Sequence, residues 1–263
     1  MIRLDANLKW LFNEVPFMDR FAAAARAGFS GVEFSLPYIY PKHAIRQQLD
    51  AHGLRYCYLV SPSGDWEAGE RGIACVPGRE REFQDGFDLA LDYAHAFDCD
   101  LVHTTIGLVP ADGEPLQCRE VLMENLERAA RRARASGVRI AIEPLCRQSY
   151  PRALVKRTAE AAAIIAELGH ANVGIVYDFH HAQREEGDLI ETIRRHLSRI
   201  LHFQIANAPG RTEPGVGEVN FPFLLDRIDA LGYTGWIGCE YTPSVSTLSS
   251  LGWAKPYGIR VND

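Results

Sequence analysis

Short apolar runs alternate with longer amphipathic segments along the whole chain. The apolar runs are rich in β-branched side chains, which is typical of buried strands. They predict eight strands, at residues 2–7, 31–35, 54–60, 100–107, 138–143, 173–178, 200–206 and 236–240. Because strands that alternate with helical segments usually pair in parallel, the pattern predicts an α/β fold.

The segments between these runs have the period of amphipathic helices. Helices are clearest at residues 17–28, 82–97, 118–137, 158–169 and 221–232. Several of them end in a glycine, which suits a helix C-terminus. The longest polar stretch, residues 61–81, is expected to be a loop within the pattern.

Eight strand–helix units in 263 residues fit a single (β/α)8 TIM barrel that spans residues 1–263. An open doubly wound sheet usually has fewer strands, and neither half of the chain has a GxGxxG motif after its first strand. The chain contains no repeat, low-complexity tract or linker that would divide it. We therefore expect one domain.

Composition and charge narrow the class of protein. Hydrophobic residues make up 47% and charged residues 24%, as in ordinary globular proteins. The net charge of -6 comes from scattered acids, which argues against a nucleic-acid groove. With no apolar run of membrane-spanning length and charges near the N-terminus, we expect no membrane segment or signal peptide, and a cytoplasmic location. The six cysteines form no CxxC pair and are expected to be free thiols.

Polar side chains stand at the ends of the last four predicted strands. Glu143 ends the fifth strand, Asp178 ends the sixth, Gln204 lies in the seventh and Glu240 ends the eighth. The carboxyl ends of the strands carry the active site in TIM barrels. These four residues are therefore expected to converge at one mouth.

Converging carboxylates need a positive partner, because a buried unpaired charge costs several kcal/mol or is neutralised. One divalent metal ion, Mg²⁺ or Mn²⁺, would satisfy an all-oxygen set of two glutamates, an aspartate and an amide. The alternative is that each acid caps a helix or pairs with a cation at its own strand. That alternative becomes less favourable when four consecutive strands each carry an oxygen-bearing side chain at their end.

Three histidines near these strand ends are expected to differ in role. His181 is three residues past Asp178 and could reach the mouth as a hydrogen-bond donor to substrate. His180 is expected to face away. His202, two residues before Gln204, is expected to be a core residue one layer deeper.

Arginines in two loops suggest an acidic substrate, since a guanidinium grips a carboxylate with two parallel hydrogen bonds. Arg71 follows the third strand and is the favoured residue for this role; Arg211 follows the seventh. Arg79 and Arg81 are instead expected to pair with loop acids, namely Glu67, Glu70, Glu80 or Glu82. Two acids of the later loop, Glu213 and Glu218, are as compatible with bracing as with catalysis.

Two glutamates beside a shared cation also suggest proton transfer. Glu143 and Glu240 lie on strands far enough apart to face each other across a small substrate. A metal that holds a carbonyl and a neighbouring hydroxyl acidifies the C–H bond between them. This layout is typical of enediolate chemistry.

The chain resembles the hydroxypyruvate isomerase family, which lies within the xylose isomerase-like TIM barrels together with ketose 3-epimerases and endonuclease IV-type apurinic endonucleases. The resemblance runs nearly end to end. Its markers are "ANL", "AGFSGVEF", "GDWEAGERGIACVPGREREF", "IEP", "YDFHHAQREEG", "HFQIANAPGRTEPGVGEVNF" and "GWIGCEY".

The resemblance implies a single metal held by Glu143, Asp178, Gln204 and Glu240, with the two glutamates as the proton-transfer pair. It also implies that His181 and Arg211 hold substrate oxygens. The family reaction interconverts hydroxypyruvate and tartronate semialdehyde (2-hydroxy-3-oxopropanoate), and close relatives isomerise 2-oxo-tetronates. A small sugar acid is thus the expected partner.

Three positions depart from the family pattern. The third strand ends in Val60 and Ser61, and Cys146 stands shortly after "IEP". The fourth strand ends "VHTTIG". Its His103 is either a substrate contact or a core residue. These residues belong to the mouth beside the metal. They leave the metal site intact and the substrate open.

Other functions remain as alternatives. A ketose 3-epimerase would use the same glutamate pair but has less need for arginines. DNA repair would require histidine-rich metal ligands and a basic surface, and a non-catalytic barrel would be expected to lose part of the ligand set. Trp253 and Tyr257 either pack on a second subunit of a homo-oligomer or cover their own barrel.

Overall fold

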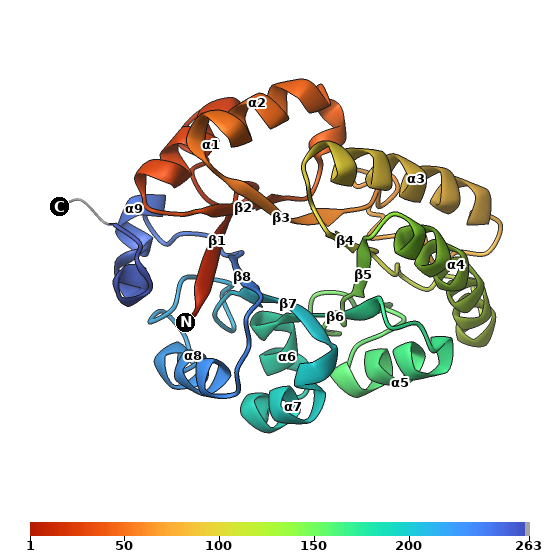
Figure 1. Cartoon of the computed structure of the whole chain (residues 1–263). Coiled ribbons are helices and arrows are strands. Elements are labelled where there is room, and N and C mark those ends of the chain that lie inside the picture. The colour runs from red at the N-terminus through yellow and green to blue at the C-terminus, as the bar shows by residue number, and fades with distance from the viewer. Residues whose placement is uncertain (261–263) are drawn as a thin grey trace.

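The strands close into a parallel barrel in the order β1 to β8. The computed structural model describes residues 1–260 and places the barrel at the centre of a ring of helices (Figure 1). The strands are β1 Arg3–Asn7, β2 Gly31–Phe34, β3 Arg55–Val60, β4 Leu101–His103, β5 Arg139–Ile142, β6 Val173–Asp178, β7 Ile200–Ile205 and β8 Trp236–Cys239. The predicted (β/α)8 TIM barrel is confirmed.

Helices cover the outside of the barrel. They are α1 Phe17–Arg26, α2 Lys42–His52, α3 Glu80–Ala96, α4 Pro115–Ala135, α5 Thr158–Leu168, α6 Phe179–Glu185, α7 Leu189–His196, α8 Phe221–Ala230 and α9 Thr247–Ser250, with 3₁₀ turns η1 Pro37–Ile39, η2 Leu197–Arg199 and η3 Gly252–Tyr257. All five helices predicted from periodicity are present. Gly169 ends α5 in the left-handed region (φ 68°), where a glycine carries no Cβ penalty.

Strand β4 is shorter than the predicted 100–107. After His103 the chain leaves the barrel, and Ile106 forms an antiparallel bridge with Gly72 of the 61–81 loop. A Cβ on Gly72 would lie 2.4 Å from the carbonyl oxygen of Thr105, so the close approach requires glycine. The backbone after His103 therefore pairs with this loop instead of extending the strand.

The apolar core has two parts. A large cluster lies between the barrel and its helices, and a small one inside the barrel contains Tyr58, Val60, Leu101, Ala141 and Val176. Trp253 and Tyr257 pack against the large cluster, so both cover their own barrel.

All six cysteines are buried and free, as expected. None of the helices within residues 1–260 is both long and apolar enough to cross a membrane.

Candidate active site

A cavity of about 350 Å³ opens at the carboxyl ends of the strands. Its wall includes five of the seven predicted site residues, Arg71, Glu143, His181, Arg211 and Glu240. The other two, Asp178 and Gln204, are buried in β6 and β7 with 3% and 2% of their surface exposed. The barrel thus brings the predicted residues to one end.

Asp178 both caps a helix and faces the cavity residues. Its Oδ1 accepts the backbone N–H of His180 at the start of α6 (2.7 Å), which is the N-cap that strand-ending aspartates favour. Its Oδ2 accepts a hydrogen bond from Arg211 Nη2 (2.9 Å). One oxygen therefore remains available to the site while the other holds the backbone.

Arg211 lies between two of the carboxylates. Its Nη2 donates to Glu240 Oε2 (2.6 Å) as well as to Asp178, and Trp10 Nε1 donates to the other oxygen of Glu240 (3.2 Å). Arg211 has a φ of 54°, a left-handed conformation that is uncommon for a side-chain-bearing residue. The loop after β7 thus holds this guanidinium inside the acidic cluster.

The cluster has more negative than positive charge. Burial, followed by repulsion from Asp178 and Glu240, raises the pKa of Glu143 well above its ordinary value. Burial also raises the pKa of Glu240 to about 7, although Arg211 opposes the shift. Asp178 is buried too, but Arg211 and His181 hold its pKa below the ordinary value. One guanidinium does not neutralise three carboxylates.

His181 is held as a neutral donor that faces the acids. Burial lowers the pKa of His181 to about 4. The backbone N–H of Cys146 donates to His181 Nδ1 (3.3 Å), so the neutral ring carries its proton on Nε2. That nitrogen lies 3.8 Å from Asp178 Oδ2 and 3.9 Å from Glu143 Oε1. The geometry suits a donor to a substrate oxygen.

His180 does not face away from the mouth, and this expectation was wrong. Its ring lines the cavity, and its Nδ1 lies within hydrogen-bonding distance (3.0 Å) of the carbonyl oxygen of Asn207. Helix α6 begins directly after Asp178, so the alternation of a strand no longer applies at this position. His180 and His181 therefore both reach the mouth.

Gln204 presents an unpaired oxygen. Its Nε2 donates to Glu33 Oε1 (3.0 Å), and its Oε1 is buried without a hydrogen-bond partner among the described residues. A carboxylate can only accept, so the contact with Glu33 fixes which end of the amide is the nitrogen. With Glu143, Asp178 and Glu240, this oxygen completes a donor set that fits a hard divalent cation.

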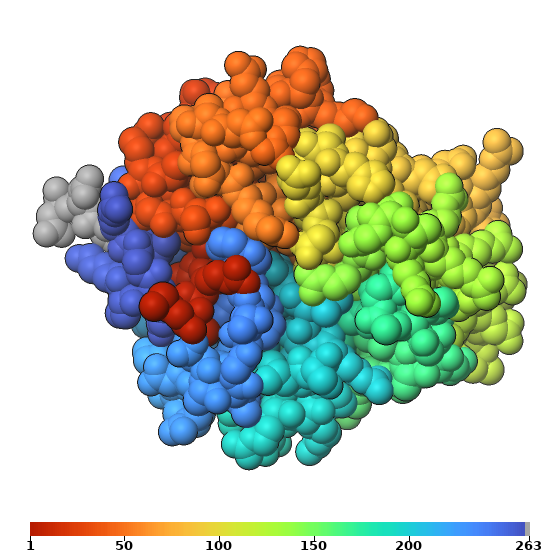
Figure 2. Space-filling model, in the orientation of Figure 1, coloured from red at the N-terminus to blue at the C-terminus, as the bar shows by residue number. Residues whose placement is uncertain are grey.

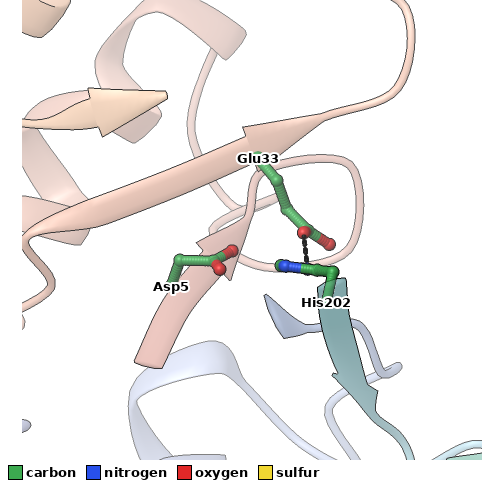
Figure 3. Close-up of side chains that lie close together, drawn as sticks. All are labelled: Asp5, Glu33 and His202. Atoms are coloured by element: carbon green, nitrogen blue, oxygen red, sulfur yellow. Dashed lines mark hydrogen bonds and ion pairs between the residues drawn. The ribbon is translucent and has the colours of Figure 1, made fainter. Parts of the chain in front are cut away.

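A second polar cluster lies inside the barrel below Gln204 and consists of Asp5, Glu33 and His202 (Figure 3). His202 Nε2 and Glu33 Oε2 are 2.7 Å apart, and Asn7 Nδ2 donates to Glu33 Oε1 (2.6 Å). A Cβ on Gly238 would lie 2.6 Å from Glu33 Oε2, so this glycine makes room for the carboxylate. Glu33 is thereby held from several sides.

His202 and Asp5, the other two members of this buried cluster, make fewer hydrogen bonds than Glu33. His202 is stacked on Tyr58 with 4.7 Å between ring centroids, which confirms it as a core residue. Asp5 has no hydrogen-bond partner for either carboxylate oxygen among the described residues. Burial and the neighbouring Glu33 raise the pKa of Asp5 well above its ordinary value.

Cations form the outer wall of the cavity. The guanidinium of Arg71 lies 3.7 Å from the ring centroid of Trp66, and its Nη1 donates to the carbonyl oxygens of Trp66 (3.0 Å) and Glu70 (2.6 Å). Lys9 Nζ lies 4.3 Å from the same ring, and burial lowers the pKa of Lys9. Both cations line the cavity.

The remaining charged residues of the loops are structural. Arg79 pairs with Glu70 and Glu82 as expected, whereas Arg81 lies 3.7 Å from Asp85. Glu213 accepts hydrogen bonds from the backbone and side chain of Ser244, and Glu218 accepts one from Gln183. Both loop glutamates brace the mouth.

The sequence reasoning missed several residues of the cavity wall, namely Lys9, Trp10, Trp66, Ser149 and Tyr150. Lys9 and Trp10 stand two and three residues after the end of β1, in "ANLKW". Polar residues at strand ends point to the site in the first two strands as well as in the last four. For β1 and β2 these residues are Asn7, Lys9 and Glu33.

Comparison with known proteins places this site in a family. A model of the xylose isomerase-like TIM barrel family matches residues 21–257. The chain belongs to this family.

Within the xylose isomerase-like family, two curated relatives match nearly end to end. The chain is 45% identical to a 2-oxo-tetronate isomerase of Cupriavidus necator over 257 residues, covering 98% of this chain and 99% of the relative. It is 41% identical to a hydroxypyruvate isomerase of Escherichia coli over 257 residues, covering 98% and 100%. Both relatives are isomerases, and so is this chain.

Solved structures agree with the fold. The crystal structure of an AP endonuclease, family 2, from Brucella melitensis has a TM-score of 0.96 and 41% identity, covering 98% of this chain and 100% of that one. A D-allulose 3-epimerase from Methylomonas sp. has a TM-score of 0.76 and 20% identity, covering 98% and 91%. The second likeness concerns the fold alone.

Proposed function

We propose that this isomerase is metal-dependent and converts a short 2-oxo sugar acid, most favourably hydroxypyruvate, into 2-hydroxy-3-oxopropanoate through an enediolate. One observation supports this above the others. Glu143 and Glu240 reach a small cavity from strands three positions apart, and the cations Lys9 and Arg71 form its outer wall. The cavity thus combines a carboxylate pair with cations suited to an acid.

The reaction moves hydrogen within the substrate. One glutamate removes a proton from C3 of hydroxypyruvate, and the other delivers a proton to C2. The C3 hydroxyl proton passes to the oxygen on C2, which leaves an aldehyde at C3 and a hydroxyl at C2. No oxidant or reductant is needed.

The other residues position the substrate. His181 donates from Nε2–H to a substrate oxygen, and its burial keeps it neutral. Arg71 is anchored by two backbone carbonyls through Nη1 and lines the cavity, where its guanidinium can bind a carboxylate. A divalent cation held by Glu143, Asp178, Gln204 and Glu240 would acidify the C–H bond next to the carbonyl.

Arg71→Met is expected to raise KM by about 10- to 100-fold with little change in kcat, because hydrogen bonds to charged groups contribute roughly 1.5–3 kcal/mol. Lys9→Met is expected to raise KM by a smaller factor. Steady-state kinetics with hydroxypyruvate measures both. Arg79→Met is the control, since Arg79 pairs with acids of the same loop. A KM for Arg71→Met within twofold of the parent would remove this residue from carboxylate binding.

Glu33→Gln is expected to weaken Mn²⁺ binding by about 10- to 100-fold, the usual effect of losing an outer-shell partner of a metal ligand. The new amide can donate as well as accept, so it no longer fixes the Gln204 oxygen toward the site. Direct Mn²⁺ titration followed by electron paramagnetic resonance measures the affinity without reference to activity.

Asp5→Asn is the matched control for Glu33→Gln. Asp5 is equally buried in the same cluster but makes no hydrogen bond to Gln204. Its variant is expected to bind Mn²⁺ within a few-fold of the parent. Equal losses in the two variants would mean that Glu33 acts through general stability of the barrel and not through Gln204.

A second candidate is isomerisation of a four-carbon 2-oxo-tetronate. It is supported by the 45% identity to the enzyme of that name from Cupriavidus necator. The chemistry at the glutamate pair would be the same, and the extra carbon would lie toward the cavity wall. Comparing kcat/KM for three- and four-carbon 2-oxo acids distinguishes the two candidate substrates. Neutral ketoses are tested alongside, because turnover of ketoses alone would indicate a 3-epimerase.

Repair of apurinic DNA is less favoured, although the chain is 41% identical to the AP endonuclease, family 2, of Brucella melitensis. The cations Lys9 and Arg71 line a cavity of about 350 Å³, whereas DNA binding relies on a basic surface that tracks many phosphates. A site dominated by carboxylates would also repel the backbone. Binding of an abasic duplex at low salt would contradict this preference.

A further inference from the structure

A second cavity lies at the amino ends of the strands, opposite the candidate active site. Its volume is about 720 Å³. Residues that open β1, β3 and β5 line it, together with residues of α7 and the turn before β8. Figure 2 shows the face of the molecule on which the N-terminal residues lie, in dark red. We refer to this cavity as the arginine basin.

Arginines dominate the wall of the arginine basin. Arg3, Arg55 and Arg139 are the first residues of three alternate strands, β1, β3 and β5. Side chains from alternate strands share a layer in a TIM barrel, so these three residues stand at one level at the amino end of the barrel. Arg194 of α7 also lines the basin, and its Nη1 pairs with Glu191 Oε1 (3.0 Å).

Acids in the wall do not balance this charge. Of the described residues that line the basin, four are arginines and one, Asp100, is acidic. Asp100 accepts hydrogen bonds from Arg55 Nη2 and Arg139 Nη2, both at 3.0 Å. Because Glu191 pairs with Arg194, the other three arginines and Asp100 leave the basin with a net positive charge, although the chain as a whole has a net charge of -6.

The guanidinium groups keep free donors and reach solvent. Arg3 donates to the carbonyl oxygen of Thr234 and lies over the Trp236 ring at 4.8 Å. The side chains of Arg55 and Arg139 are 51% and 41% exposed, so a solute can reach them. Each guanidinium has five N–H donors, and the bonds described here use few of them.

We infer that the arginine basin binds a small phosphorylated molecule through its phosphoryl group. Several guanidinium groups in the wall of one cavity suit a phosphoryl group, whose terminal oxygens accept hydrogen bonds from several directions. The volume suits a small molecule and not a polymer. This site is independent of the function proposed for the other end of the barrel.

Calorimetric titration of the full chain with inorganic phosphate and with pyrophosphate tests the site, in metal-free buffer so that the anions do not bind a cation. Saturable binding is expected, tighter for pyrophosphate, and citrate is expected to bind more weakly. Arg139→Gln and Arg3→Gln are each expected to weaken pyrophosphate binding at least tenfold. Arg119→Gln, which removes a surface arginine of similar exposure on α4, is expected to leave binding unchanged.

Asp100→Asn separates binding from structure. Removing the carboxylate is expected to tighten pyrophosphate binding by about tenfold, because it frees two guanidinium groups. An arginine network with a purely structural role would instead lose thermal stability with no gain in affinity. Absence of saturable binding, or loss of binding in Arg71→Met at the other end of the barrel, would overturn the inference.

Discussion

Glu143→Gln and Glu240→Gln are each expected to lower kcat by about a thousandfold or more. General acid–base catalysis contributes roughly 10²–10⁴ in rate, and each glutamate is also a proposed metal ligand. An amide keeps the shape of the side chain but can neither take up a proton nor supply one. Steady-state turnover of hydroxypyruvate measures the loss, and activity within tenfold of the parent in either variant would exclude that residue from proton transfer.

The two variants are expected to differ in stability when metal is removed. Burial and neighbouring acids raise the pKa of Glu143, so the folded protein holds this proton more tightly than the unfolded chain does. The folded state therefore loses stability as the pH rises above the ordinary glutamate pKa, and Gln removes that loss. At neutral pH, metal-free Glu143→Gln should melt at or above the temperature of the parent.

Glu240→Gln is expected to gain less stability than Glu143→Gln, because Arg211 opposes the raised pKa of Glu240. The Glu240 carboxylate accepts hydrogen bonds from Arg211 and Trp10, and its variant leaves the Arg211 guanidinium with one carboxylate fewer. Its melting temperature should therefore fall below that of Glu143→Gln. Thermal unfolding followed by circular dichroism measures both, and the reverse order would contradict the charge balance described for this cluster.

Asp178→Asn is expected to lower Mn²⁺ affinity at least a hundredfold and to lower turnover at subsaturating metal in proportion. The change removes a charge but retains the N-cap, because the Asn side-chain oxygen still accepts the His180 N–H. The fold should therefore survive. Direct Mn²⁺ titration and thermal unfolding check the two parts.

Asp178→Ala is the companion variant. It loses both the charge and the cap, so it should bind metal as poorly as Asp178→Asn and be about 1 kcal/mol less stable. Mn²⁺ affinity in Asp178→Asn that equals the parent value would contradict the role of Asp178 as a ligand. A large loss of stability in the Asn variant would mean that the Arg211 pair, and not the cap, holds this end of β6.

The barrel and its acidic mouth follow from local sequence features. Each apolar run is long enough to specify a strand, and Glu143, Asp178 and Glu240 stand directly at strand ends. The closed topology then brings these ends together. Neither inference requires knowledge of a loop conformation, which is why both could be made from the sequence.

Contacts between distant segments were not predictable in the same way. Glu33 and Gln204 are 171 residues apart and meet through the register of the barrel. The Arg71–Trp66–Lys9 wall depends on the path of a loop after β3, and the end of β4 depends on the same loop through Gly72. His180 was misassigned because a helix begins at the residue before it.

The departures from the hydroxypyruvate isomerase pattern lie where the substrate would bind. Val60 and His103 line the cavity, and the backbone of Cys146 holds His181. His103 Nε2 lies 3.7 Å from Glu143 Oε2, and burial lowers the pKa of His103 to about 3. These residues leave the carboxylates in place and shape the space around them, so they bear on substrate length more than on reaction type.

The most direct test follows the reaction itself in D₂O. The protein is stripped with a chelator, dialysed, supplied with Mg²⁺ or Mn²⁺, and mixed with hydroxypyruvate while proton NMR follows the substrate. The account predicts metal-dependent formation of 2-hydroxy-3-oxopropanoate with deuterium at the α-carbon. Conversion without metal, or product that retains only protium at that carbon, would contradict an enediolate formed by two exchanging glutamates.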